Sequence, residues 1–399
     1  MKTLGWLLLF FGGCVQELPT LGPLDGSVDA PLHDAESPDI PRPDASLARP
    51  GHTLAAGTDH TCIVVEEQLL CFGSNAFGQL GIEGGDLLTP TLVEAGRRWR
   101  EVAAGERFSC GLVADGGVLC WGDNRDGQLG DGTFNTRTAP TAIAGLSADH
   151  LRTGYHGACL VTDAGEMRCW GRNSEGQLGV DSAGGAPPPE PSPVLVSVQD
   201  WTGVDVSQGH ACALSGTDLY CWGRNTQGQL GLGAGAPEQL RLPTLVQEGN
   251  FQRVVVGPVN GCTLDESGAL YCWGSNAAGQ LGTGTGMDAL TPTLVDGRRF
   301  SDIDIDTFHA CAITEGELYC WGRNAEGQLG LGDLSIHTTP TRVGAFTDWV
   351  EVAVGRFHSC AKRSDGSVWC AGENEDGRLG VGDTGRRRDF TEVVLPGPG

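Results

Sequence analysis

One eleven-residue phrase recurs along the chain and limits what the chain can fold into: Cys-Trp-Gly-x-Asn-x-x-Gly-Gln-Leu-Gly. Two altered copies flank the complete ones, with Phe72 in place of Trp in the first and with Ala371 and Arg378 in place of Trp and Gln in the last. The second cysteines of successive units, from Cys71 to Cys370, lie 48 to 52 residues apart. A fixed period in this range is typical of solenoids, propellers and other repeat arrays. The complete copies begin at Cys120, Cys169, Cys221, Cys272 and Cys320.

Each of the seven units contains four short runs that predict β-strands, separated by glycine-rich turns. Radial packing of several four-stranded sheets buries both faces of each sheet and leaves few exposed edges. We therefore predict an all-β, seven-bladed propeller of four-stranded antiparallel blades over residues 51–396, with a parallel β-helix as the alternative. The pattern leaves the blade boundary open, and with an offset a strand beginning near His52 would close the last blade beside Val393-Val394. In the second unit the four runs are residues 99–105, 109–113, 118–121 and 140–143.

The repeated phrase, its period and a preceding Gly-x-x-His-Ser/Thr/Ala pattern resemble the regulator of chromosome condensation repeat family. The resemblance covers residues 51–395, which hold all seven units, and it implies a seven-bladed propeller. Members of this family act as guanine-nucleotide exchange factors for a small GTPase, as light sensors, as ubiquitin-ligase modules and, in bacteria, as secreted protein inhibitors. The resemblance therefore implies a fold and leaves the function open.

Fourteen of the fifteen cysteines form regular pairs, nine or ten residues apart. If Glu66-Glu67 forms a two-residue turn, Cys62 lies directly opposite Cys71 on the neighbouring strand, close enough for a disulfide. The resembled family usually has small or apolar residues at both positions, so a matched replacement in every unit favours cross-strand disulfides. Zinc binding and reduced, buried thiols are the alternatives, although the spacing differs from that of zinc ligands. The predicted pairs are Cys62 with Cys71, Cys110 with Cys120, Cys159 with Cys169, Cys212 with Cys221, Cys262 with Cys272, Cys311 with Cys320 and Cys360 with Cys370.

The first fifty residues predict an exported chain. An apolar run from Leu4 to Phe11, followed by two glycines and Cys14, is typical of a secretory signal peptide. Small residues directly before a cysteine resemble the bacterial lipoprotein signal, so we expect removal of residues 1–13 and lipidation of Cys14, with a simple secretory signal as the alternative. Residues 14–50 are rich in Pro, Asp, Ser and Ala and predict a disordered tether. We expect a cell-envelope protein on the periplasmic face or the cell surface, attached to the membrane through this lipid only.

Composition and motifs argue against several classes of function. The formal net charge is −24, which disfavours nucleic-acid binding. The Gly-Gln-Leu-Gly-x-Gly stretches follow no strand-to-helix step and carry no Lys-Ser/Thr, so they predict turns and not phosphate-binding loops. No Ser/His/Asp or Cys/His set can be assigned, and we expect no catalytic residue, no cofactor and no metal. A histidine two positions before the first cysteine occurs in four units, where we expect it to cap backbone groups of its own blade: His60, His210, His309 and His358.

Two insertions break the repeat, and they are the candidate binding loops. Each follows a Gly-Gln-Leu-Gly turn and precedes a proline-led strand, so we expect both at the same end of the propeller, where loops on a rigid scaffold commonly bind partners. The first spans residues 180–191 and the second spans residues 232–241, and tolerated spacers are the alternative. The candidate residues are Val180, Asp181, Pro187 and Glu190 in the first loop and Leu232, Glu238 and Arg241 in the second.

These features together predict a monomeric, non-enzymatic, envelope-anchored scaffold that binds a protein or an envelope glycan through loops on one propeller face. The family resemblance offers guanine-nucleotide exchange as an alternative, although an exported chain would not meet a cytosolic GTPase. A secreted enzyme inhibitor and an envelope enzyme are the remaining alternatives.

Overall fold

The computed structural model describes residues 52–181, 187–197 and 200–397. The signal peptide, Cys14 and the tether predicted for residues 1–50 lie outside this described part. Within it, every regular element is a β-strand, as the repeat predicts. No helix in the described ranges has the length and the apolar composition that a membrane span needs.

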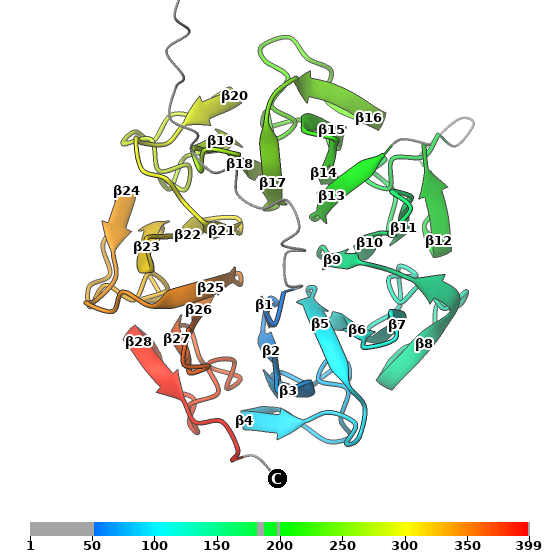
Figure 1. The fold of residues 1–399 in the computed structure, drawn as a ribbon, viewed down its shortest axis with the longest axis vertical. Helices are drawn as coiled ribbons and strands as arrows, with labels where there is room; N and C mark the ends of the chain where they lie inside the picture. The colour runs from blue at the N-terminus through cyan, green and yellow to red at the C-terminus, as the bar shows by residue number, and fades with distance from the viewer. Residues whose placement is uncertain (1–51, 182–186, 198–199, 398–399) are drawn as a thin grey trace, which may run out of the picture. The chain divides into compact units, whose positions relative to one another are not determined.

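The strands form seven four-stranded antiparallel sheets, arranged as propeller blades around a common axis (Figure 1). Each blade uses four consecutive strands, with the first innermost and the fourth outermost, which confirms the predicted fold. The innermost strands are β1 (Leu54–Ala56), β5 (Trp99–Ala104), β9 (His150–Thr153), β13 (Trp201–Val206), β17 (Phe251–Val256), β21 (Asp302–Ile305) and β25 (Trp349–Val354). The second strands are β2 (His60–Val65), β6 (Phe108–Val113), β10 (Gly157–Val161), β14 (His210–Ser215), β18 (Asn260–Asp265), β22 (His309–Thr314) and β26 (His358–Arg363). The third strands are β3 (Gln68–Gly73), β7 (Gly117–Gly122), β11 (Met167–Gly171), β15 (Asp218–Arg224), β19 (Leu270–Gly274), β23 (Glu317–Gly322) and β27 (Val368–Gly372), and the fourth are β4 (Leu87–Leu92), β8 (Arg137–Ser147), β12 (Glu190–Val196), β16 (Gln239–Gln247), β20 (Ala289–Leu294), β24 (His337–Arg342) and β28 (Arg387–Val393).

The blade boundaries fall between the sequence units, without an offset. β1 pairs with β2, with Leu54 opposite Ile63, and β28 pairs with β27, with Val393 opposite Val368. The offset closure, in which a strand near His52 would lie beside Val393-Val394, is therefore not formed. The physical reason is local, because a tight turn in which the Gly57 N–H bonds to the His60 carbonyl folds β1 back onto its own blade.

All seven predicted cysteine pairs form disulfides between the second and third strands of their blades, with Cα atoms 4.1 Å apart in each. The zinc and free-thiol alternatives are therefore wrong for these fourteen residues. In chain order the disulfides join Cys62 to Cys71, Cys110 to Cys120, Cys159 to Cys169, Cys212 to Cys221, Cys262 to Cys272, Cys311 to Cys320 and Cys360 to Cys370.

The turn between the second and third strands sets the register that brings each pair of cysteines together. In the first blade Glu66 and Glu67 have φ angles of 49° and 62°, and this turn places Cys62 opposite Cys71. Where the pair is ten residues apart, a glycine with positive φ in the turn absorbs the extra residue, as Gly116 does at 85°. Both turn lengths therefore lead to the same cross-strand disulfide.

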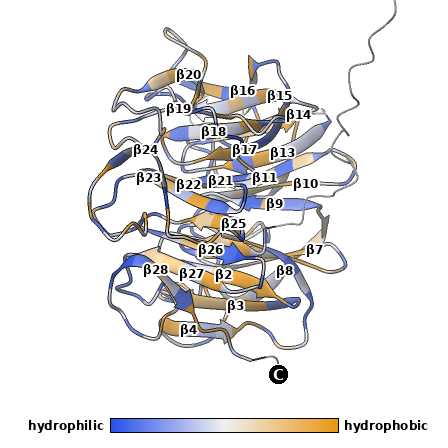
Figure 2. Cartoon of the chain, turned by 60° about the vertical axis from the view of Figure 1, so that its left-hand side comes forward, coloured by the Kyte–Doolittle hydropathy of each residue, from blue (hydrophilic) through white to orange (hydrophobic). Residues whose placement is uncertain are grey.

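The tryptophan of the repeated phrase seals the seam between neighbouring blades. Trp121 is fully buried, and its indole N–H donates to the backbone carbonyl of Gln79 in the preceding blade at 2.9 Å. Figure 2 shows how apolar residues gather along strands inside the blades, such as β2 and β3, while the connecting loops are more hydrophilic. Four further seams repeat this bond at 2.9 Å: Trp170 to Gln128, Trp222 to Gln177, Trp273 to Gln229 and Trp321 to Gln280.

The seam between the last and first blades is not crossed by the chain, and charged side chains hold it. Glu351 of β25 accepts hydrogen bonds from the backbone N–H groups of Thr53 and Leu54, at 2.8 and 3.0 Å. Arg378, which replaces the glutamine of the phrase, is buried, donates to the Thr58 carbonyl and pairs with Asp59 at 2.9 Å. Charge-assisted hydrogen bonds of this kind are stronger than neutral ones, so they support the junction that has no covalent link.

Three of the four repeat histidines, all except His210, bridge neighbouring blades and do not cap the backbone of their own blade, so that prediction was wrong for them. His60 Nε2 lies 2.8 Å from the Ser109 hydroxyl of the next blade, and that hydroxyl donates its proton to the Gln79 carbonyl. The histidine must therefore donate from Nε2. The register of a single unit cannot reveal this, because the partner belongs to the next unit. The same bridge joins His309 to Ser359 and His358 to Thr61, each at 2.9 Å.

Candidate functional site

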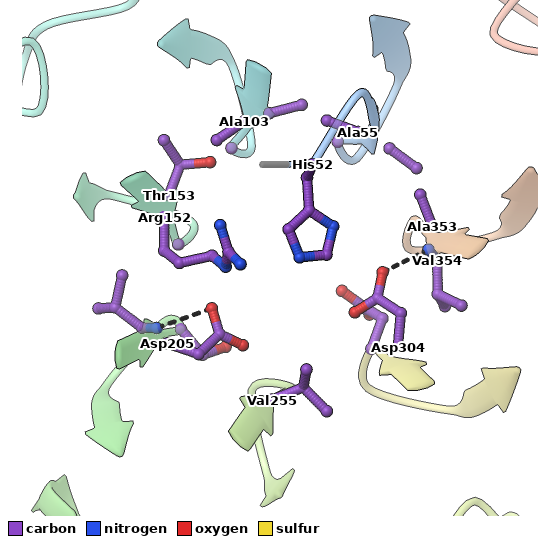
Figure 3. A pocket seen from close by; sticks show the side chains of 18 of the residues that line it. His52, Ala55, Ala103, Arg152, Thr153, Asp205, Val255, Asp304, Ala353 and Val354 are labelled. Carbon is purple, nitrogen blue, oxygen red and sulfur yellow. Dashed lines mark hydrogen bonds between the residues drawn. The ribbon is translucent and has the colours of Figure 1, made fainter. Parts of the chain in front are cut away.

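The seven innermost strands enclose a cavity on the propeller axis, shown in Figure 3. Its volume is about 120 Å³, which suits several water molecules or one very small solute. Small residues such as Ala55, Ala103 and Ala353 form part of the wall. Charged side chains form much of the rest, and their arrangement decides what the cavity can do.

Two aspartates of the cavity wall each link their own innermost strand to the innermost strand of the next blade. Asp205 of β13 accepts a hydrogen bond from the Val256 backbone N–H of the fifth blade at 2.7 Å. Asp304 of β21 accepts one from the Val354 backbone N–H of the seventh blade at 2.6 Å. Burial raises the pKa of Asp205 to about 6 and that of Asp304 to about 7, although the backbone donors act in the opposite direction. These carboxylates therefore titrate close to neutral pH.

Two arginines also line the cavity. Arg152 donates to the buried carboxylate of Glu101 in the preceding blade at 2.7 Å, and Figure 3 shows its side chain directed towards the axis beside Asp205. Burial raises the pKa of Glu101, although the Arg152 charge opposes that shift. Arg253 pairs with Asp302 of the next blade. The charged groups thus link the innermost strands of the second and third blades, and those of the fourth to the seventh blades.

The cavity is closed at one end by a hydrogen bond between opposite sides of the propeller. Tyr155 follows β9 of the third blade, and its hydroxyl donates to the Asp306 carboxylate of the sixth blade at 3.0 Å. Burial raises the pKa of Asp306, and donors from Thr307 and from Tyr155 oppose that shift. A cavity of this size serves as the polar core of the fold more readily than as a substrate pocket.

We define the turn face as the end of the propeller that carries the turns between first and second strands and the loops between third and fourth strands. Arginines stack on aromatic rings of this face, some within one blade and some across a seam between blades. Arg107 lies 4.7 Å from the centre of the Phe77 ring, and Arg323 lies 5.4 Å from Phe308. Further stacks on this face are Arg125 on Phe77, Arg323 on Phe357 and Arg356 on Phe357.

The predicted binding loops both lie on the turn face, in the third and fourth blades. Val180 and Asp181 begin the first loop, Pro187 is buried and Glu190 starts β12, while residues 182–186 are outside the described part. In the second loop Leu232 and Arg241 are partly buried and Glu238 is exposed. The two loops are brought together, because Arg241 packs against Gly176 in the turn that precedes the first loop. Their role in binding stays a prediction.

The cavity charges and the arginine stacks were missed by the sequence analysis. The signal for the cavity was present in the alternating stretches Val204-Asp205-Val206 and Asp302-Ile303-Asp304. An acidic residue between β-branched residues of an innermost strand points away from the blade core, towards the axis or the next blade. Among the described residues no group of three or more His, Cys, Asp and Glu side chains is arranged to hold a metal ion.

The structure defines the class of protein: a seven-bladed propeller with one disulfide in each blade. Comparison with known families identifies the family to which it belongs. The RCC1-like domain matches residues 150–397, and the regulator of chromosome condensation (RCC1) repeat matches residues 66–112, 99–128 and 115–153. The chain belongs to the RCC1-like domain family.

Similar proteins share short segments with this chain. The probable E3 ubiquitin-protein ligase HERC4 of Mus musculus is 36% identical over 115 residues, which cover 27% of this chain and 11% of that protein. The regulator of chromosome condensation of Homo sapiens is 33% identical over 108 residues, which cover 27% of this chain and 25% of that protein. The chain thus matches about a tenth to a quarter of the length of these relatives.

Solved structures support the fold over a longer span. Prp20p from Saccharomyces cerevisiae superposes with a TM-score of 0.73 at 21% identity, covering 86% of each chain. Human WBSCR16 superposes with a TM-score of 0.68 at 22% identity, covering 76% of this chain and 83% of the other. At these identities the likeness concerns the fold alone.

Proposed function

We propose that this protein is an exported, non-enzymatic binding scaffold that recognises a protein partner through the turn face. The observation that carries the proposal is the set of arginine–aromatic stacks around the closed end of the cavity, represented by Arg107 on Phe77 and Arg323 on Phe308. Arginine and aromatic residues are enriched at the centres of protein interfaces, where they contribute much of the binding energy.

The scaffold is suited to this role because it is rigid before it binds. Each blade carries its own disulfide, and each of five seams carries a buried tryptophan hydrogen bond. A preformed surface loses little conformational entropy on binding. The structurally similar Prp20p has been described with its binding properties to Gsp1p and histones, which supports the use of this fold for protein recognition.

Export accounts for the disulfides. Seven disulfides in one chain indicate an oxidising compartment, which is unsuited to an exchange factor acting on a cytosolic GTPase. In this proposal residues 1–13 direct export, Cys14 carries the lipid, residues 14–50 hold the propeller away from the membrane, and residues 51–396 form the binding domain.

The test compares capture of envelope proteins by the tagged full-length chain and by two variants. Arg323→Ala combined with Phe357→Ala removes a stack on the turn face, whereas Arg298→Ala removes the stack of Arg298 on Tyr319, 4.6 Å apart, at the opposite end. We expect a partner captured by the wild type and by Arg298→Ala, with at least a tenfold loss for the double variant when binding is remeasured with purified proteins. Equal capture by both variants would refute the turn face as the binding surface.

A further inference from the structure

The seventh blade departs from the repeat at two positions that compensate each other. Ala371 stands where five blades have the seam tryptophan, and Phe390 precedes the partner of Cys370 in β28. The Phe390 ring packs over Gly330 beside the Ala371 methyl, in the space that the tryptophan fills elsewhere. Six blades have proline at the Phe390 position: Pro90, Pro140, Pro193, Pro243, Pro292 and Pro340.

A groove lies beside this exchange, between the sixth and seventh blades, and we call it the flank groove. Its volume is about 290 Å³, at the lower end of the range for small-molecule sites. Phe346 packs on Trp369 with ring centres 5.3 Å apart, and Trp349 packs on Phe390 at 5.8 Å. Phe346 is 39% exposed and Trp369 is partly exposed, so aromatic surface remains accessible in the groove.

The groove also has polar groups at its edge. Arg342 and Asp389 line it, and both side chains are exposed. The Asp389 carboxylate makes no side-chain hydrogen bond or ion pair within the described residues. The Arg342 guanidinium lies 2.8 Å from a Glu317 carboxylate oxygen, so its charge is already balanced. The groove therefore combines flat apolar surface with a hydrogen-bond acceptor and a neutralised arginine.

We propose that the flank groove binds one pyranose ring of a glycan. The apolar C–H face of the sugar would stack on the Trp369 indole, and sugar hydroxyls would donate to Asp389 and accept from Arg342. A nucleotide or other phosphate ligand fits less well, because both nearby arginines already face acids: Arg342 faces Glu317, and Arg363 lies 2.9 Å from Asp348. An acyl chain fits less well because a groove of about 290 Å³ with a charged edge is too short and too polar.

The flank groove is separate from the turn face, so the proposal stands apart from the proposed protein partner. The register supplies a matched control. Trp369 lies directly before the second cysteine of its blade, and Tyr271 holds the same position in the fifth blade, where it packs on Phe251 with ring centres 6.3 Å apart. A change at Tyr271 disturbs an equivalent aromatic contact outside the groove.

The experiment measures binding of maltotriose, cellotriose, chitotriose and mannotriose to the full-length protein by saturation-transfer difference NMR and by calorimetric titration. We expect saturation of sugar C–H protons for at least one of these sugars, an affinity at least tenfold weaker in Trp369→Ala and Trp369→Leu, and a change within twofold in Tyr271→Ala. Trp369→Leu retains apolar bulk in the core, and the thermal midpoint of each variant shows that it is folded.

Three outcomes would overturn the proposal. The first is the absence of binding for all four sugars at millimolar concentration. The second is sugar binding that Trp369→Leu leaves unchanged. The third is capture of a protein by the wild type that Trp369→Leu loses while no sugar binds, which would reassign the groove to a protein partner. None of these outcomes depends on whether the turn-face variants lose their own partner.

Discussion

The hydroxyl of Tyr155 in the third blade donates a hydrogen bond to the carboxylate of Asp306 in the sixth blade, at 3.0 Å. The two residues are 151 positions apart in the sequence. They meet at the turn face, because Asp306 directly follows the innermost strand β21 and Tyr155 lies two residues after the end of the innermost strand β9. Burial raises the pKa of Asp306, so the phenol supplies a donor to a carboxylate that water solvates poorly. The bond links two non-adjacent blades and closes the axial cavity.

Replacing Tyr155 by Phe should lower the free energy of unfolding by about 1–2 kcal/mol, because the buried Asp306 carboxyl group loses a hydrogen-bond donor. The loss should be larger at pH 8 than at pH 5, because the Tyr155 hydrogen bond lowers the pKa of Asp306 and its removal therefore costs more stability as the pH rises. Urea unfolding followed by tryptophan fluorescence at both pH values measures the difference. Tyr319→Phe, which removes a partly buried hydrogen bond from the phenol to Glu317, is the control. An equal loss at both pH values would contradict this account of Asp306.

The Asp304→Asn variant should become more stable relative to the wild type as the pH rises from about 4 to about 7. Burial raises the pKa of Asp304 from 3.8 to about 7. In this window the folded wild type retains a proton that the unfolded chain releases, so the Asp304 contribution to stability falls with rising pH. The asparagine has no such proton and still offers an oxygen to the Val354 N–H.

The quantity to measure is the difference in unfolding free energy between Asp304→Asn and the wild type, at several pH values. The difference is needed because burial lowers the pKa of His60, His210 and His309 to about 3, and these histidines make stability rise with pH in the same window. Their effect cancels when the two proteins are compared. Asp205 and Arg253 act on Asp304 through charge and are unchanged by the substitution. A difference that stays flat from pH 4 to pH 8 would show that Asp304 is ionised throughout.

His60→Phe and His210→Phe should have opposite effects, although both residues are fully buried at the same repeat position. His60 bonds to Ser109, so its loss should cost about 1–3 kcal/mol. Gly261 holds the position of that serine in the blade after His210, and neither nitrogen of the His210 ring has a side-chain partner among the described residues. Because phenylalanine already occupies this position as Phe108 in the second blade, His210→Phe should be neutral or stabilising. Thermal and urea unfolding distinguish the two, and a similar loss in both variants would refute the role of the bridge.

These contrasts show what the sequence could and could not predict. The pairing of Cys62 with Cys71 follows from nine residues and one two-residue turn, so local geometry alone fixes it. The blade count follows in the same way from the period. The contact of Tyr155 with Asp306 depends on how seven blades close around an axis, and no short-range pattern encodes it. The arginine stacks that join different blades, such as Arg107 on Phe77, were missed for the same reason.

Removing one disulfide by combining Cys110→Ala with Cys120→Ala should lower the free energy of unfolding by about 3 kcal/mol, as the chain-entropy account predicts for a loop of this length. Both residues are fully buried and opposite each other, so alanine leaves no unpaired polar group. Non-reducing peptide mapping of the wild type should give seven links, each within one blade. Disulfides between blades, or a loss of unfolding free energy below about 1 kcal/mol, would show that the disulfide within a blade does not stabilise that blade.

At the seam between the last and first blades, loss of the partly buried Glu351 side chain should lower the free energy of unfolding more than loss of the buried Arg378 side chain. Glu351→Ala removes the acceptor of two backbone N–H groups, those of Thr53 and Leu54, and should cost about 3 kcal/mol or more. Arg378→Gln introduces the glutamine that the other six copies of the phrase have at this position. This glutamine can donate to the Thr58 carbonyl, as Arg378 does, in the way that Gln177 donates to the Gln208 carbonyl. This substitution should cost less, because only the ion pairs of Arg378 with Asp59 and Asp376 are lost. Urea unfolding of both variants gives the comparison, with hydrogen exchange at the Leu54 N–H as a local readout. If Glu351→Ala leaves that amide as protected as in the wild type, the carboxylate does not hold the first strand in place.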